Sequence, residues 1–299
     1  MADMKPPEKE GTLQGLLAIL NLEELDVNLF RGQSPDEAWQ RVFGGQVIGQ
    51  ALVAASRTVE KRRCHSLHAY FLRAGDPSVP ILYEVDRARD GGSFSARRVI
   101  AVQRGKQIFN LAASFQTGEE GLEHQDPMPP DMPPPEELKT QEEWRQEVAH
   151  KLPPDLRSHF TRPRPIEIRP VAPRDMLQPQ KAPPVQTVWF RVREKMPNDD
   201  GLHQCVLGYM SDMTLLDTAQ RPHGISWMNK HLQVASLDHA MWFYRPFRVD
   251  EWLLYHQTSP GSAGGRGFNL GHVFTRQGQL VCSVAQEGLM RVRPKSSRR

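Results

Sequence analysis

The sequence predicts an α+β protein built from two copies of one unit, a long buried helix followed by an antiparallel sheet that wraps it. The first observation is a repeat: HAYFLR (68–73) resembles HAMWFYR (239–245), and ILY (81–83) resembles LLY (253–255). The offset stays at about 172 residues, and two copies at so long a period indicate an internal duplication, not a solenoid. The second observation is that both copies share the order helix, strands and glycine turn, which a chance likeness of hydrophobic strands does not explain.

The first half contains a helix and then strands. Residues 45–59 (GQVIGQALVAASRTV) are small or apolar all round, which predicts a buried helix. Strand-like runs follow at 65–73, 81–89 and 95–116, and the last of these folds around a glycine turn at 104–106.

The second half repeats this pattern after one extra strand. Residues 185–195 alternate like a strand, and the apolar segment 205–218 has the length of a helix. Strand patterns return at 237–247, 251–259 and 267–292.

Between the halves lies a proline-rich connector. Fifteen of the 25 prolines fall between Pro127 and Pro184, and proline stiffens the chain and removes a backbone donor. We expect an N-terminal domain at 12–118, a connector at 119–184 and a C-terminal domain at 185–294.

Composition excludes several classes of protein. The 299 residues are 38% hydrophobic and 24% charged, with a net charge of +3, so a globular core is expected and a nucleic-acid partner is not. No apolar run reaches the length of a membrane span, and the N-terminus has no signal-peptide core. Three separated cysteines favour a reducing compartment, and no HExxH, GxSxG or P-loop motif is present, so we expect no metal and no cofactor.

Three residues are candidates for catalysis. Asp212 lies in the apolar segment YMSDMTLL, where a buried carboxylate is costly unless bonded and would have a raised pKa, useful in a general base. The alternative is that it faces a solvated stripe or caps a turn. Gln286 ends an apolar strand and can orient a polar molecule, because an amide donates and accepts, unless it points to water. Ser236 precedes a strand, where serine is commonly a turn or cap residue.

A second candidate region is the glycine turn at the start of the first helix. Backbone amides of Gly44, Gly45 and Gln46 would form an anion site there, or the turn simply feeds the helix. Asp238 and His239 are adjacent in a strand and point to opposite faces, which argues against a catalytic dyad.

Seven motifs in order resemble the acyl-CoA thioesterase II family. They cover about residues 16–294: FGGQVIGQAL, HSLHAYFLRAGDP, DGGSFSARRV, YMSDMTLLDT, PHGISW, SLDHAMWFYRPFRVDEWLLY and AQEGLMR. The resemblance implies a tandem (double) hotdog fold, with two antiparallel sheets each wrapping a long buried helix, in agreement with the duplication.

The resemblance also implies hydrolysis of fatty acyl-CoA to a free fatty acid and coenzyme A. Family members hold the attacking water with an Asp, a Thr or Ser, and a Gln, which fall here on Asp212, Ser236 and Gln286. Some members carry Thr in place of Ser236, so the hydroxyl is kept but its rotamer is less restricted.

The nucleotide of coenzyme A carries several negative charges, for which we expect arginine partners. The candidates are Arg63, Arg97, Arg98 and Arg266. Two other functions remain as alternatives: a hotdog enoyl-thioester hydratase, and a module that binds or senses acyl-CoA without reaction.

The remaining expectations concern place and assembly. Peroxisomal members end in a Ser-Lys-Leu-type tripeptide, whereas this sequence ends in KSSRR, which favours a cytoplasmic, bacterial setting. Because one chain supplies both hotdogs, the basic dimer is internal, and free edges leave room for a homo-oligomer, dimer or tetramer.

Overall fold

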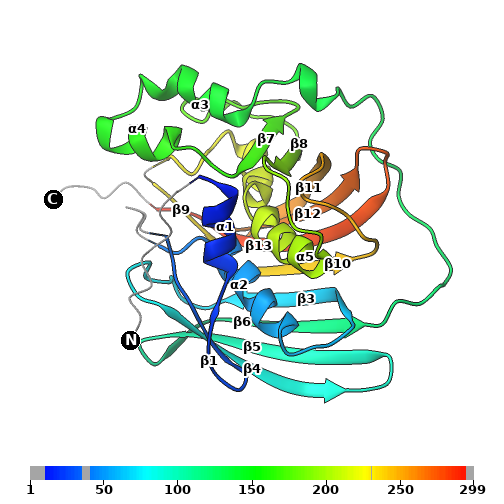
Figure 1. The fold of residues 1–299 in the computed structure, drawn as a ribbon. Helices are drawn as coiled ribbons and strands as arrows, with labels where there is room; N and C mark the ends of the chain where they lie inside the picture. Colours follow the sequence, from blue (N-terminus) through cyan, green and yellow to red (C-terminus); the bar gives the residue numbers. More distant parts are fainter. Residues whose placement is uncertain (1–10, 36–40, 230, 294–299) are drawn as a thin grey trace.

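Figure 1 shows the fold as a computed structural model, which describes residues 11–35, 41–229 and 231–293. In the N-terminal half the elements are α1 (Leu13–Leu20), β1 (Glu23–Asp26), β2 (Leu29–Gly32), α2 (Gly44–Ser56), β3 (Arg63–Phe71), β4 (Ile81–Asp90), β5 (Phe94–Gln103) and β6 (Lys106–Gln116). The C-terminal half contains β8 (Val185–Val192), α5 (Asp200–Ser211), the 3₁₀ helix η2 (Leu215–His223), β9 (Leu232–Ser236), β10 (Asp238–Phe243), β11 (Leu253–Ala263), β12 (Arg266–Thr275) and β13 (Leu280–Val292). The two-copy α+β prediction is confirmed.

The two half-sheets hydrogen-bond to each other edge to edge. Strands β3 and β10 pair antiparallel, with Ala240 opposite His68 and Met241 opposite Leu67. Within the described ranges the result is one 13-stranded sheet in the order β1-β2-β4-β5-β6-β3-β10-β13-β12-β11-β8-β7, where β7 is Ile166–Pro170 of the connector and β9 is paired to β13. The two sheets that we expected are therefore continuous at the junction of the halves.

The central helices α2 and α5 pack against each other and run antiparallel. A side chain at Gly45 would overlap the carbonyl oxygen of Tyr209, and one at Gly49 would lie 3.2 Å from that of Cys205. The two backbones thus approach each other at two points that lie four residues apart on each helix. The order of these points along the chain is reversed between the helices, so the helices are antiparallel. An approach this close requires glycine on α2, because any other residue would carry a Cβ atom there. Helix α2 lies against β3, β4, β5 and β6 of its own half, and α5 also contacts β3 of the N-terminal half (Figure 1).

The C-terminal helix differs from the predicted span of 205–218. It begins earlier, because Asp199 caps it by accepting a hydrogen bond from the Leu202 amide (3.1 Å). It ends at Ser211, with Asp212 as the C-cap, and the chain then continues as the 3₁₀ helix η2. Asp212 therefore stands at the end of a helix and not within it.

The connector is partly folded and lies along the C-terminal half. It contains η1 (Pro135–Glu137), α3 (Gln141–Ala149), α4 (Pro154–Thr161) and β7 (Ile166–Pro170). Strand β7 pairs with β8 and so extends the C-terminal sheet, and Figure 1 shows α3 and α4 beyond this edge. No helix in the described part of the chain is long and apolar enough to cross a membrane.

Candidate active site

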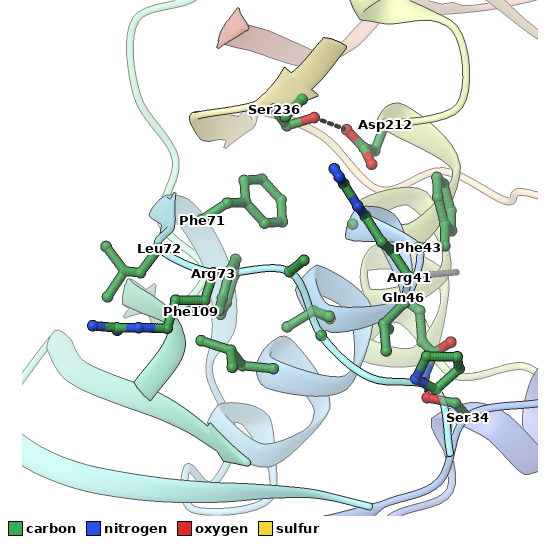
Figure 2. A pocket seen from close by; sticks show the side chains of 18 of the residues that line it. Ser34, Arg41, Phe43, Gln46, Phe71, Leu72, Arg73, Phe109, Asp212 and Ser236 are labelled. Carbon is green, nitrogen blue, oxygen red and sulfur yellow. Dashed lines mark hydrogen bonds between the residues drawn. The ribbon is translucent and has the colours of Figure 1, made fainter. Parts of the chain in front are cut away.

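A cavity of about 500 Å³ lies where the start of α2 meets the end of α5. Its wall is completed by the end of β3, the start of β6 and strand β9, so both halves of the chain contribute to it. Figure 2 shows part of this lining, which includes Phe43, Gly44, Val47, Phe71, Phe109, Tyr209, Asp212, Ser236 and Leu237.

The three residues predicted to be catalytic lie together at this cavity. Gln286 donates from Nε2 to Oδ1 of Asp212 at 2.6 Å, and Ser236 donates from Oγ to the same oxygen at 3.4 Å, the bond drawn in Figure 2. The pairing of β9 with β13 places Ser236 opposite Gly288, close enough for its Oγ to lie 3.3 Å from Nε2 of Gln286.

The three side chains do not face the cavity equally. Asp212 and Ser236 line it and are partly exposed, whereas Gln286 is fully buried and is absent from the lining. Gln286 therefore contacts the carboxylate from the protein side. Its Oε1 accepts no hydrogen bond from the described residues.

The two glycines at the start of α2 make room for the carboxylate. A side chain at Gly44 would stand 2.6 Å from Oδ2 of Asp212, and the backbone N–H of Gly45 donates a hydrogen bond to the carboxylate. The positive end of α2 thus meets the acid directly. The amide of Gln46 bonds the carbonyl of Phe43 (3.1 Å), so two of the three amides predicted as an anion site already have protein partners.

Burial raises the pKa of Asp212 to about 6, against the hydrogen bonds from Gln286, Gly45 and Ser236, which lower it. Its place at the C-terminal end of α5 acts in the same direction as burial, because the helix dipole is negative there. At neutral pH the group is mostly ionised and is a stronger base than an exposed aspartate.

His239 is a site residue that the sequence reasoning did not select. It is fully buried, with Nδ1 3.1 Å from Nε2 of Gln286 and Nε2 2.9 Å from Oγ of Ser211. The amide nitrogen of Gln286 can only donate, so Nδ1 of His239 accepts. Nε2–H of His239 then donates to Ser211, whose hydroxyl donates to the carbonyl of Gly208 (3.0 Å). Burial lowers the pKa of His239 to about 3, so the ring is neutral.

A signal for His239 was present in the sequence. Aligning SLDHAMWF with VAQEGLM as an antiparallel pair, with Ala240 opposite Ala285, places His239 opposite Gln286. Asp238 lies on the other side of the strand and accepts the Glu287 amide (2.6 Å), as the alternation argument required.

The arginines predicted to bind the nucleotide lie away from this cavity. Arg97 is buried and donates to Thr58 and to the carbonyls of Arg89 and Ala96, and it pairs with Asp90. It therefore stabilises the fold, and its guanidinium is not available to a ligand.

The other three arginines are exposed but do not line the cavity. Arg266 pairs with Glu287 (2.9 Å), Arg98 is exposed on β5, and Arg63 pairs with Asp200 at the opposite end of the central helices.

Arg41 and Arg73 line the cavity instead, both within or beside motifs already singled out. Arg41 precedes the FGGQ turn and Arg73 ends the HAYFLR strand. Figure 2 shows the Arg41 side chain pointing into the cavity. Both side chains are exposed, so they form a positive rim at its mouth.

Comparison with known proteins shows the family to which the chain is related. A family model described as acyl-CoA thioesterase matches residues 155–289, and one described as acyl-CoA thioesterase N-terminal domain matches residues 35–116. The human protein named acyl-coenzyme A thioesterase 8 is 44% identical, over 96% of this chain and 92% of its own.

Solved structures are also similar. The acyl-CoA thioesterase II TesB2 of Mycobacterium marinum is 48% identical, with a TM-score of 0.76 over 93% of this chain and 98% of that one. A hot dog fold protein from Alicyclobacillus acidocaldarius has a TM-score of 0.70 at 18% identity, over 92% of this chain and 97% of its own, and this shows the fold alone. Fold and site together define a double-hotdog thioester hydrolase. The chain belongs to the acyl-CoA thioesterase family.

Proposed function

We propose that this chain hydrolyses fatty acyl-CoA to a free fatty acid and coenzyme A with a water activated by Asp212. The observation that carries the proposal is the 2.6 Å hydrogen bond from Gln286 to Asp212 Oδ1, with the same carboxylate facing the cavity. Ser236 orients the water beside the acid, and Gln286 fixes the direction of the carboxylate.

The reaction proceeds by general-base catalysis. Asp212 accepts a proton as the water oxygen attacks the thioester carbonyl carbon, and a tetrahedral oxyanion forms. The carbon–sulfur bond then breaks, and the thiolate recovers the proton from Asp212. Positioned base catalysis of this kind contributes roughly 10²–10⁴-fold.

The cavity has separate surfaces for the two ends of the substrate. Val47 of α2 and Phe71 and Phe109 of the sheet form an apolar wall between helix and strands, which suits an acyl chain. Arg41 and Arg73 at the mouth suit the phosphates of the nucleotide, because guanidinium groups bind phosphate oxygens with two parallel donors.

Release of free thiol from palmitoyl-CoA and shorter homologues tests this function. We expect thiol release by the wild type and a loss of roughly 10²-fold or more in kcat for Asp212→Asn. A hydratase would consume an enoyl thioester without releasing thiol, and a binding module would yield no product. Either result would contradict hydrolysis.

Two features support proposals about setting and assembly. Cys64, Cys205 and Cys282 are free and buried, which supports action in a reducing compartment such as the cytoplasm.

The outer edges of β1 and β7 have no further strand in the described sheet, which supports association into a dimer or tetramer. Light scattering of the purified chain measures the assembly.

A further inference from the structure

The antiparallel pair of central helices has a second end, and a second cleft lies there. The cavity of the active site borders the start of α2 and the end of α5. At the opposite end, the last turn of α2 and the first turn of α5 border a cleft of about 960 Å³. An adjoining cleft of about 560 Å³ shares five lining residues with it, Lys61, Arg63, Cys64, Asp200 and Gln204.

The repeat in the sequence relates the two ends residue by residue. With the offset of about 172 residues, positions 71–75 of the active-site lining correspond to 243–247, which line the adjoining cleft. Positions 234–237, which include Ser236, correspond to positions 62–65. Each residue of 62–65 lines the second cleft, the adjoining cleft or both. The second cleft is therefore the pseudo-twofold counterpart of the active site.

The second cleft lacks the groups that activate water. The C-cap of α5 is Asp212, whereas the C-cap of α2 is Arg57, which donates to the Leu22 carbonyl (2.5 Å) and to Asn21 (2.8 Å). At the corresponding level of β6 the buried, helix-facing residues are Ala113 and Phe115, whose side chains cannot donate a hydrogen bond.

The carboxylates that line the second cleft already have partners. Asp199 caps α5 through the Leu202 amide, and Asp200 pairs with Arg63. A water in this cleft would therefore meet no equivalent of the Asp212 base.

The second cleft keeps the features that bind a CoA thioester. Arg245 lines the adjoining cleft at the position of Arg73, and each donates to a carbonyl of the neighbouring strand, Leu280 and Gln107 respectively. Arg245 also pairs with Glu123 (2.9 Å). Lys61 is exposed and lines both clefts, so it places a positive charge at their shared rim.

An apolar wall for an acyl chain is also present. It is formed by α1, the end of α2, the end of β6 and the start of α5, through Leu17, Leu20, Val53, Phe115 and Leu202.

We propose that this second cleft binds the CoA moiety of another acyl-CoA molecule and does not hydrolyse it. Each chain then carries one hydrolytic and one non-hydrolytic thioester site. The proposal needs the acyl-CoA substrate class of the family, and it does not depend on which residues of the active site perform the chemistry.

Binding stoichiometry tests the proposal. Wild-type chain is titrated by equilibrium dialysis with S-octyl-CoA, a thioether that cannot be hydrolysed, and in parallel with free coenzyme A. We expect two equivalents of the thioether per chain. Binding of free coenzyme A at the second cleft shows recognition of the nucleotide portion, whereas binding of the thioether alone shows that the apolar wall is required.

Two variants remove the second cleft by different means. Lys61→Glu reverses charge at the rim, and Gly201→Trp fills the cleft, where a side chain at Gly201 has no neighbour closer than 3.4 Å. Both should bind one equivalent of the thioether and keep wild-type kcat/KM. Arg98→Gln, which removes a positive charge outside both clefts, should still bind two.

The result that overturns the proposal is one equivalent in the wild type. Two equivalents that persist in both variants place the extra site elsewhere and overturn it as well. Because kcat/KM is measured on the same samples, loss of the active site is recognised separately from loss of the second cleft.

Discussion

Replacing Asp212 with Asn changes charge with almost no change in shape. The carboxamide oxygen of the variant can still accept the hydrogen bond from Gln286, but the side chain cannot take a proton from water. We expect kcat to fall by roughly 10²–10⁴-fold, the usual contribution of a positioned general base. The assay is thiol release, with KM measured in the same experiment and expected to stay near its wild-type value.

The same substitution changes the stability of the folded protein by an amount that depends on pH. Burial raises the pKa of Asp212 from 3.8 to about 6, so the native state holds its proton more tightly than the unfolded chain does. Ionisation therefore destabilises the wild type as pH rises from about 4 to 6, and the full cost, about 3 kcal/mol at 1.36 kcal/mol per pKa unit, is present above pH 6.

The Asp212→Asn variant has no ionisable group at this position and does not carry this cost. Its side chain loses the hydrogen bond from Gly45, which subtracts about 1–3 kcal/mol at every pH. The stability of the variant relative to wild type should therefore rise by about 2 kcal/mol between pH 4 and pH 7. Unfolding in denaturant at the two pH values measures this difference.

Two results would refute the reasoning. One is turnover by Asp212→Asn within tenfold of wild type, and the other is a wild-type kcat/KM that is flat between pH 5 and 7, where titration of Asp212 should give a rising limb. Asp238→Asn is the matched control: its carboxylate caps the Glu287 amide on the other side of β10 and is expected to leave the rising limb in place.

Three further substitutions address the surroundings of this acid. His239→Leu removes the acceptor for a buried N–H of Gln286 and should lower kcat about 10-fold or more with KM unchanged. His239→Asn restores an acceptor and should recover most of kcat. An equal loss of kcat in both variants contradicts a positioning role for His239. Gly44→Ala places a methyl 2.6 Å from Oδ2 of Asp212 and should lower kcat and shift the pH limb together, and an unchanged limb would contradict the crowding. Arg73→Gln should raise KM for acyl-CoA about tenfold with little change in kcat, measured at low salt, and the effect should shrink at high salt because the contact is electrostatic.

The secondary structure was predictable where one periodicity dominates. Strand β5 alternates buried Val99 and Ala101 with more exposed neighbours, which is the period-two pattern expected of a half-buried strand. The helix α2 was predictable from the opposite signal, since its small and apolar residues on every side suit a position between a sheet and a second helix. Both signals are local, so a single sequence carries them.

The positions of charged groups were less predictable, because they depend on packing between distant segments. Arg97 reads as an exposed strand residue, and only the fold places it against Thr58 at the end of α2. The end of α5 depends likewise on α2, because the carboxylate of Asp212 is held there by the Gly45 amide. His239 could have been found by aligning two strands, whereas Arg97 could not.

The two C-caps give a physical reason for the proposed difference between the two duplicated units. The last turn of a helix exposes carbonyl oxygens and a negative dipole, so a cation at this position is stabilised and an anion is not. Arg57 at the end of α2 has the charge that the helix dipole favours, its side chain donates to the Leu22 carbonyl beyond the end of α1, and it leaves no base at this position. Asp212 at the end of α5 is unfavourable for its own helix, and it is tolerated because the positive end of α2 and the amide of Gln286 meet it from the other side. Burial together with this unfavourable position on α5 raises the pKa of Asp212, so the basicity proposed for the reaction and the energetic cost of the ionised acid have one physical cause.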